Sequence, residues 1–205
     1  NGLKELISST DSPWIPILPD LKIKYFANFI SEKDSNRYFN CFMNLIPWKQ
    51  DSIRVYGKTY DQPRLTSLHG INEKSYSYSG IKMYPQKMTK ELIEIKNKIS
   101  KVCFTSFTSV LLNFYRDGKD SNGWHADDEP ELGINPVIAS VSFGEERFFQ
   151  LKHKTKKIET IKFKLESGSL LLMEDSTQHN WYHKIAKTSK NIGPRINLTY
   201  RKIYN

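Results

Sequence analysis

Polar side chains recur at every second position in the run Arg195-Ile196-Asn197-Leu198-Thr199-Tyr200-Arg201, near the end of the chain. Side chains alternate between the two faces of a β-strand, so in a strand these polar groups would share one face. A guanidinium binds carboxylate through a fork of two hydrogen bonds, and the amide and hydroxyl between the arginines add polar contacts. The spacing therefore predicts a strand that grips a small dianion. The predicted ligands are Arg195, Asn197, Thr199 and Arg201.

Three other side chains have the types and spacing of a metal site. His125 and Asp127 are two residues apart, at the period of a strand, and His183 lies shortly before the polar run. Two histidines and one carboxylate are typical of non-haem Fe(II) centres with open coordination positions. His179 and His183 would share one face of a helix, as in zinc sites, but the residues between them favour a strand. We therefore predict His125, Asp127 and His183 as the metal ligands, with a cupin-type zinc hydrolase as a competing hypothesis.

A second polar pair strengthens this interpretation. Asn113 and Tyr115 would share one face of a strand, opposite Leu112 and Phe114. A strand with a wet polar face at a sheet edge is the structural alternative for such a pattern. An interior that held all of these polar groups would be costly to bury without a ligand. A metal and a dicarboxylate would satisfy it, and this combination predicts oxidative chemistry.

The rest of the sequence predicts the scaffold for these groups. Ser31 can cap a helix that ends near Ile46, and Thr89 can cap a second helix. From Ser109 onward the sequence has the texture of short strands separated by turns. We place these strands near residues 109–116, 123–127, 137–143, 146–153, 157–165, 169–174, 181–186 and 195–203. Helices followed by short strands favour an α+β, mainly β fold: a jelly-roll or cupin-like double-stranded β-helix core with N-terminal helices.

Composition restricts the class of protein. The 205 residues carry 31 Lys and Arg against 22 Asp and Glu, a net charge of +9, with six lysines between residues 152 and 164. This basic stretch, together with 11 Phe, 11 Tyr and 4 Trp, favours a nucleic-acid partner, with a solubilising surface as the alternative. No apolar run approaches the roughly 18 residues of a membrane span, and no secretory signal is visible. Only Cys41 and Cys103 are present, so we expect an intracellular protein, nuclear or cytoplasmic, that acts as a monomer without membrane contact.

Several motifs, in order and with the family's spacing from about residue 52 to 203, resemble the AlkB family of Fe(II)/2-oxoglutarate-dependent dioxygenases. They are Asn113-Phe114-Tyr115, His125-x-Asp127, Ser140-Val141-Ser142-Phe143-Gly144, Trp181-Tyr182-His183 and Arg195-x-Asn197-x-Thr199-x-Arg201. The resemblance implies that His125, Asp127 and His183 hold Fe(II). It also implies that Arg195 pairs with the distal carboxylate of the cosubstrate 2-oxoglutarate and Arg201 lies nearer its metal-bound end. Asn113, Tyr115 and Asn197 would complete that cosubstrate site.

The resemblance is closest to the nucleic-acid repair branch of the family. It implies a nucleotide-recognition lid that includes Arg64 and Tyr76, in which Tyr78 stacks on a flipped base and His125 forms the other wall. Asp128 or Glu129 would contact the base edge, and Tyr56 would fill the gap in the duplex. These elements divide one globular domain into an N-terminal arm (1–30), helices and lid (31–108) and a catalytic core (109–205).

The implied reaction is the oxidative demethylation of N1-methyladenine and N3-methylcytosine in DNA, with O2 and 2-oxoglutarate consumed. The products would be succinate, CO2 and formaldehyde. The alternatives are an RNA demethylase with the same chemistry and a catalytically silent nucleic-acid-binding module. Oligonucleotide turnover and iron binding would discriminate among them.

Overall fold

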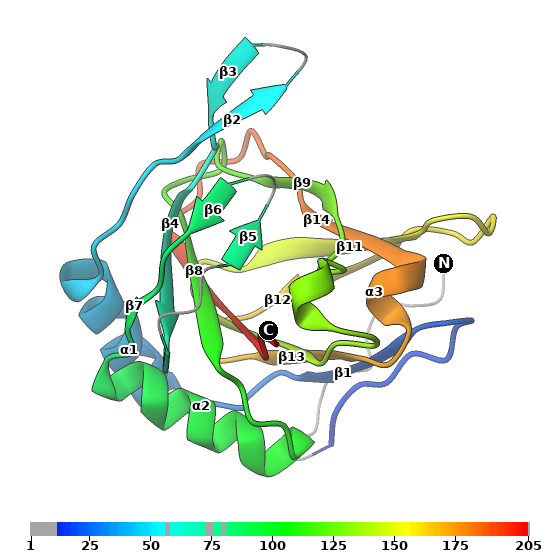
Figure 1. The fold of residues 1–205 in the computed structure, drawn as a ribbon, viewed down its shortest axis with the longest axis horizontal. Coiled ribbons are helices and arrows are strands. Elements are labelled where there is room, and N and C mark those ends of the chain that lie inside the picture. Colours follow the sequence, from blue (N-terminus) through cyan, green and yellow to red (C-terminus); the bar gives the residue numbers. More distant parts are fainter. Residues whose placement is uncertain (1–11, 56–57, 73–75, 79–80, 205) are drawn as a thin grey trace.

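Two β-sheets face one another in a double-stranded β-helix (Figure 1). The computed structural model describes residues 12–55, 58–72, 76–78 and 81–204. Within these residues the larger sheet has seven strands, in the order β1 (Lys22–Phe26), β13 (Leu170–Glu174), β10 (Ile138–Gly144), β15 (Arg195–Arg201), β8 (Ser109–Tyr115), β4 (Leu65–Gly70) and β7 (Gln86–Lys87). The smaller sheet has four, in the order β12 (Ile161–Leu165), β11 (Arg147–His153), β14 (Trp181–Ile185) and β9 (Asn122–His125). Two hairpins stand apart, β2 (Ser52–Val55) with β3 (Lys58–Asp61) and β5 (Tyr76–Tyr78) with β6 (Ile81–Met83).

The predicted helices form where their caps indicated. Helix α1 (Glu32–Leu45) follows Ser31, whose hydroxyl accepts a hydrogen bond from the Asp34 N–H. Helix α2 (Lys90–Cys103) follows Thr89, which accepts from the Leu92 N–H in the same way. Such caps satisfy backbone donors that have no partner inside the helix. Both helices cover the face of the larger sheet that points away from the smaller sheet, and a single-turn helix α3 (Thr177–Asn180) precedes β14 (Figure 1).

A hydrophobic core lies on each side of the larger sheet. The core between the two sheets includes Ile23, Leu111, Phe149, Leu151, Leu171 and Trp181. The core between the sheet and the helices includes Phe42, Leu92, Ile95, Ile196, Leu198 and Tyr200. A slip of one residue in the register of β15 would turn its apolar side chains away from the helices. Burying each such side chain stabilises the fold by about 1.5–3 kcal/mol. The polar face of β15 is thereby fixed in the space between the sheets.

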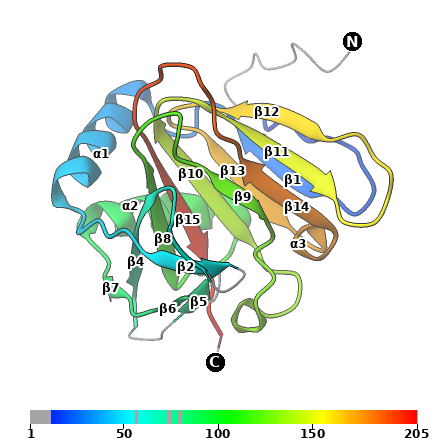
Figure 2. The ribbon, with the colours of Figure 1, turned by 90° about the horizontal axis from the view of Figure 1, so that it is seen from above.

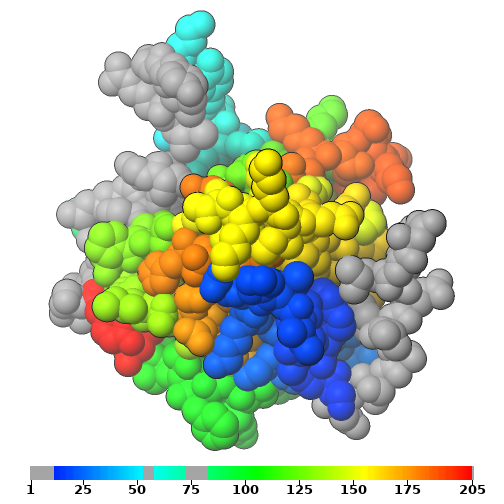
Figure 3. Space-filling model, turned by 90° about the vertical axis from the view of Figure 1, so that its right-hand side faces the viewer, coloured from blue at the N-terminus to red at the C-terminus, as the bar shows by residue number. Residues whose placement is uncertain are grey.

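The N-terminal segment is more ordered than the sequence suggested. We expected an irregular arm over residues 1–30, but β1 pairs antiparallel with β13 at one edge of the larger sheet. Before β1, Asp20 contacts Lys156 and His153 on the hairpin between β11 and β12, and Trp181 donates a hydrogen bond to the Pro19 carbonyl. Figure 3 shows this segment (dark blue) lying directly against the hairpin (yellow). The segment therefore ties the edge of one sheet to the other.

The other strand predictions hold with shifts at their ends. Each predicted strand from residue 109 onward corresponds to one of β8 to β15. Strand β12 begins at Ile161 rather than near 157, and β9 ends at His125 rather than at 127. Strands β2 and β3 pair antiparallel, from Ser52 opposite Asp61 to Val55 opposite Lys58. Among the described helices, none is long and apolar enough to cross a membrane.

Candidate active site

Strand β15 carries the polar run at the centre of the larger sheet. It pairs antiparallel with β10 on one side and with β8 on the other, where Arg195 lies opposite Tyr115 and Asn197 opposite Asn113. The backbone hydrogen bonds to both neighbouring strands fix the position of each polar side chain in the space between the sheets. One pocket in this space is lined by the whole predicted metal and cosubstrate set: Asn113, Tyr115, His125, Asp127, His183, Arg195, Asn197, Thr199 and Arg201.

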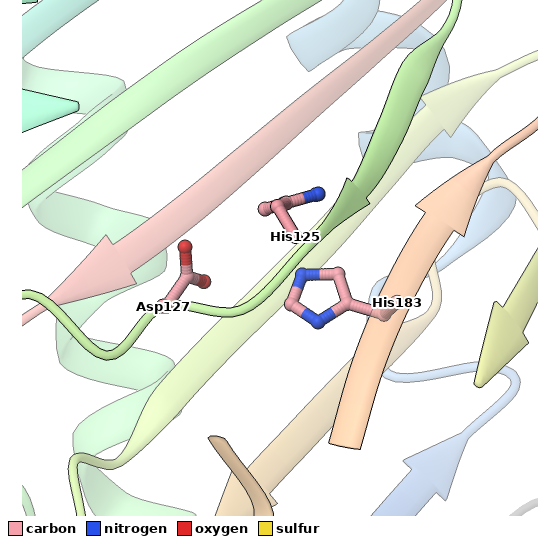
Figure 4. A group of neighbouring side chains, drawn as sticks. All are labelled: His125, Asp127 and His183. Carbon is pink, nitrogen blue, oxygen red and sulfur yellow. The ribbon is translucent and has the colours of Figure 1, made fainter. Parts of the chain in front are cut away.

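The predicted metal ligands converge in this pocket. His125, Asp127 and His183 each offer a ligand atom, and these atoms lie within 4.8 Å of one another. His125 lies opposite His183 in the ladder between β9 and β14, with ring centroids 4.2 Å apart. We had expected Asp127 to lie on the same strand as His125. Instead it lies in a loop, two residues beyond the end of β9. Figure 4 shows its carboxylate turned toward the two imidazoles from that loop.

The protonation states of the cluster suit a metal ion. Burial and the nearby His125 lower the pKa of His183 to about 3, so this ring is neutral at neutral pH. The His125 Nδ1 lies 2.7 Å from the Gly123 carbonyl and must donate its proton there, which leaves the lone pair on Nε2. Burial raises the pKa of Asp127, but Arg201 and the two histidines outweigh it, and the pKa stays below its usual value. Neutral imidazoles and an ionised carboxylate are the forms that bind metals.

Two buried partners orient the Asp127 carboxylate and its loop. Arg201 donates from Nη2 to Oδ1 of Asp127 at 2.8 Å, and both side chains are at most 3% exposed. The Asp127 N–H donates to Oε1 of Gln178 at 2.8 Å, and Gln178 in turn donates to the sulfur of Met173. Partners of this kind fix the orientation of a metal ligand. Sequence analysis missed Gln178, because a glutamine 51 positions away has no recognisable spacing to the cluster.

Arg195 lies at the other end of the polar strand. It is 1% exposed, its Nη2 donates to the Ser142 hydroxyl at 2.9 Å, and its guanidinium carbon lies 5.1 Å from the Tyr115 ring centroid. Burial lowers the pKa of Arg195 to about 10, so the group is still cationic at pH 7. Its Nε and Nη1 have no hydrogen-bond partner among the described residues. A buried cation with two unused donors is costly unless an anion binds it, so this residue fits the distal carboxylate of 2-oxoglutarate.

The middle of the polar face is bonded within the protein. The Asn197 amide donates to the Ser140 hydroxyl at 2.7 Å and accepts from the Thr199 hydroxyl at 2.9 Å. Asn113 accepts a hydrogen bond from Nε of Arg64 at 2.9 Å. The two arginines at the ends of the strand therefore provide its charge, and the residues between them form a polar wall.

The predicted base-recognition residues lie outside the lining of this pocket or outside the described side chains. Arg64 is 4% exposed, and besides Asn113 it contacts the Ser121 carbonyl. Asp128 forms an ion pair with Lys154 at 2.8 Å, and Glu129 precedes the 3-10 turn Pro130–Leu132. Tyr56 lies outside the described residues, as do the side chains of Tyr76 and Tyr78 on β5.

The fold is of the double-stranded β-helix class, and the chain belongs to the 2OG-Fe(II) oxygenase superfamily, whose sequence model matches residues 22–201. Among its relatives, AlkB homolog 3 of Bos taurus, an alpha-ketoglutarate-dependent dioxygenase, is 40% identical over 86% of this chain and 64% of its own length. The DNA oxidative demethylase ALKBH2 of Homo sapiens is 37% identical over 74% of this chain and 60% of its own length. The predicted resemblance to AlkB is thus confirmed.

The match to these relatives is partial in length. The chain spans between 64% and 66% of the four AlkB homolog 3 relatives that it matches. The solved structure of OsALKBH1 covers 92% of this chain with a TM-score of 0.66, and 99% of that structure is matched, at 17% sequence identity. That likeness confirms the fold.

Proposed function

We propose that this chain oxidatively demethylates N1-methyladenine and N3-methylcytosine in DNA, with Fe(II), O2 and 2-oxoglutarate. The observation that carries the proposal is the buried Arg195, whose two unused donors share a pocket with a His-Asp-His cluster. A planar carboxylate accepts such a pair of hydrogen bonds. The relative ALKBH2 is a DNA oxidative demethylase, and this supports DNA as the substrate.

In this proposal each end of the pocket has a distinct role. His125, Asp127 and His183 would hold the iron, and Arg195 would bind the distal carboxylate of 2-oxoglutarate. Arg201, which already holds Asp127, would lie nearer the metal-bound end of the cosubstrate. The remaining polar wall would consist of Asn113, Tyr115, Asn197 and Thr199. When bound, Fe(II), O2 and 2-oxoglutarate supply an oxidation that hydroxylates the N-methyl group, which leaves as formaldehyde, while 2-oxoglutarate becomes succinate and CO2.

The apolar part of the pocket would keep the reaction dry. Phe149, Leu165, Met173 and Ile185 line it from β11, β12, β13 and β14. Excluding water strengthens the attraction between the fixed guanidiniums and a carboxylate, since the effective dielectric constant falls. It also protects a reactive oxidising centre from side reactions.

A base in a duplex must leave its stack before it reaches this pocket, at a cost of a few kcal/mol, least for a damaged or unpaired base. The methylated bases carry a positive charge, which suits the acidic pair Asp128 and Glu129 that directly follows Asp127. We propose that this pair, Arg64, Tyr76 and Tyr78 recognise the base and that Tyr56 fills the gap that the base leaves in a duplex. The lysine-rich stretch 152–164 would contact phosphates, so affinity should fall steeply with salt.

The test is mass spectrometry of an oligonucleotide with a single N1-methyladenine, incubated with protein, Fe(II) and ascorbate, with and without 2-oxoglutarate. Single-stranded DNA, duplex DNA and RNA carrying the same lesion would be compared in parallel. Loss of one methylene mass from DNA only when 2-oxoglutarate is present is the expected result. Succinate formation without demethylation would refute the substrate, and faster turnover of RNA than of DNA would favour the RNA demethylase. If neither product forms, the catalytically silent binding module is the better description.

We also propose that the protein acts as a monomer inside the cell. Cys41 and Cys103 are free thiols in the structure, as suits a reducing compartment. Light scattering of the purified chain tests the monomer, and a mass near twice 24.0 kDa would overturn it.

A further inference from the structure

The outer face of the smaller sheet has an unusual composition. Strands β12, β11, β14 and β9 lie side by side (Figure 2). Side chains on their inner face line the pocket, among them Leu165, Phe149, His183 and His125. Strand alternation turns large aromatic side chains to the outside at three positions: Trp124 on β9, Tyr182 on β14 and Phe148 on β11. They are 40%, 40% and 41% exposed, respectively. Three such rings on one solvent-facing sheet surface call for an explanation, because core packing does not require them there.

Each of these rings has a lysine ammonium over it. Lys184 lies 4.4 Å from the Trp124 ring centroid and Lys154 lies 4.9 Å from that of Tyr182. The third pair, Lys162 over Phe148, has a separation of 4.1 Å. An ammonium over a ring is held by the negative face of the π-system, by about 0.5–1 kcal/mol at an exposed site. Contacts that weak can be exchanged for a stacked base, and the released ammonium would remain within reach of the phosphate.

The charged side chains that strands β11, β12 and β14 turn to this face, here called the lysine–aromatic face, are all lysines. Its lysines are Lys152, Lys154, Lys162, Lys164 and Lys184. Two of them are neutralised, since Lys154 pairs with Asp128 and Lys164 with Glu146. Lys152, Lys162 and Lys184 form no salt bridge with any described acidic residue. Unpaired lysines that alternate with exposed rings are complementary to a polyanion with flat bases.

The face also has a suitable position and length. Trp124 directly precedes His125 on the edge strand β9, and Tyr182 directly precedes His183, so the rings lie on the reverse side of the strands that carry the histidines. Tyr182 is level with Lys152 on β11, and Phe148 is four residues further along that strand. At about 3.4 Å per residue, these two rings are roughly 14 Å apart along the sheet, a span of a few nucleotides. Strand β9 is an edge strand of the smaller sheet, so this face ends at the strand that carries His125.

We propose that the lysine–aromatic face binds the single DNA strand that flanks the reacting base. The bases stack on Trp124, Tyr182 and Phe148, and the lysines neutralise the phosphates between them. The occupant is single-stranded because paired bases have no free face to stack on a protein ring. An acidic peptide would pair with the lysines but leave the rings unused. The inference rests on the proposed function only in that the strand is the substrate strand.

The test is fluorescence anisotropy of the full chain with a labelled, unmodified 20-nucleotide single strand and with the matching duplex, without iron. Phe148→Leu keeps an apolar side chain at a position that is 41% exposed, so the fold is not at risk. Loss of one stacking ring should weaken single-strand binding about 5- to 150-fold and leave duplex binding nearly unchanged. Equal losses on both substrates, or no loss on either, would overturn stacking at this face.

A second set of variants tests the charge. Changing Lys152, Lys162 and Lys184 together to Gln should make the slope of log K against log salt concentration for single-strand binding less steep by about two. Each lost phosphate contact accounts for roughly 0.7 of that slope. The matched control changes Lys96, Lys98 and Lys101 to Gln on α2, which lies against the other sheet, and so removes the same charge. The control variant should bind like wild type. An equal loss of affinity in both triple variants would show that the face contributes only non-specific charge, and it would overturn the proposal. Binding is measured without turnover. A wild-type protein that binds single strands but does not demethylate them would therefore refute the proposed function and leave the proposed binding face standing.

Discussion

Replacing Arg195 by Met should strongly weaken 2-oxoglutarate binding while leaving the ligand-free protein at least as stable as wild type. The side chain is 1% exposed and cationic, and two of its donors have no partner among the described residues. Hydrogen bonds to a charged group are worth about 1.5–3 kcal/mol each, so two of them contribute about 3–6 kcal/mol to carboxylate binding. At about 1.4 kcal/mol per factor of ten, the Kd for 2-oxoglutarate should rise by roughly two to four orders of magnitude. Without ligand, removing a buried cation that is poorly satisfied is neutral or stabilising.

Two measurements on each protein separate these effects. Calorimetric titration with 2-oxoglutarate, with Mn(II) in place of Fe(II), gives the Kd, and thermal unfolding of the ligand-free protein gives its stability. Arg195→Lys is the control, because it keeps the charge but loses the two-pronged geometry, and it should bind with intermediate affinity. The reasoning is refuted if Arg195→Met binds 2-oxoglutarate like wild type. It is also refuted if the variant loses several kcal/mol of stability, since the guanidinium would then be a structural group rather than a binding group.

Two further predictions concern the metal cluster, and a third concerns the ion pair between Arg116 and Asp120 in the segment between β8 and β9. His183→Ala should lose stoichiometric Mn(II) binding in equilibrium dialysis, and retained binding would remove this residue from the ligand set. Gln178→Met should weaken Mn(II) binding about 10- to 100-fold, because the Asp127 N–H loses its acceptor, whereas circular dichroism should be unchanged. Asp120→Asn should cost about 1–3 kcal/mol in urea unfolding at pH 7, because Asp120 accepts two hydrogen bonds from the Arg116 side chain. Burial raises the pKa of Asp120, but these bonds outweigh it and leave the pKa below its usual value, so this stability is full above about pH 4 and is lost as the pH falls through the lowered pKa. A variant whose deficit is the same at pH 7 and at pH 2 would contradict that assignment.

Patterns with a fixed period were read correctly from the sequence. The alternation in β15 predicted which side chains enter the pocket, because a strand that is packed on one face has only one possible register. The same period was present in β1, where Ile23 and Tyr25 are buried and Lys22 is exposed. We missed that strand because nearby prolines favoured irregular structure. The alternating pattern indicated a strand and the prolines indicated irregular structure, and this conflict limited the prediction of the N-terminal segment.

Contacts that depend on tertiary structure could not be read in this way. The Asp127 carboxylate reaches the cluster from a loop, and its partner Gln178 comes from a single-turn helix that no periodicity indicates. The bonds of Asn197 with Ser140 and Thr199 were also invisible, since a polar residue in a strand does not reveal whether protein or ligand satisfies it. The predicted metal and cosubstrate residues do lie together in one pocket, but the sequence did not reveal the way in which they hold one another.

The order of strands in the larger sheet has a consequence for how this chain folds. Its central strand, β15, is the last strand in the sequence, and the edge strand β1 pairs with residues almost 150 positions later. Proteins dominated by such distant pairings fold slowly, because the entropy of closing long loops must be overcome before native contacts form. During synthesis β8 and β10 each have an unpaired edge until β15 forms between them. Unpaired strand edges promote aggregation. Strand β15 thus completes both the pocket and the larger sheet. A nascent chain that ends before Arg195 would have neither a complete pocket nor a complete sheet.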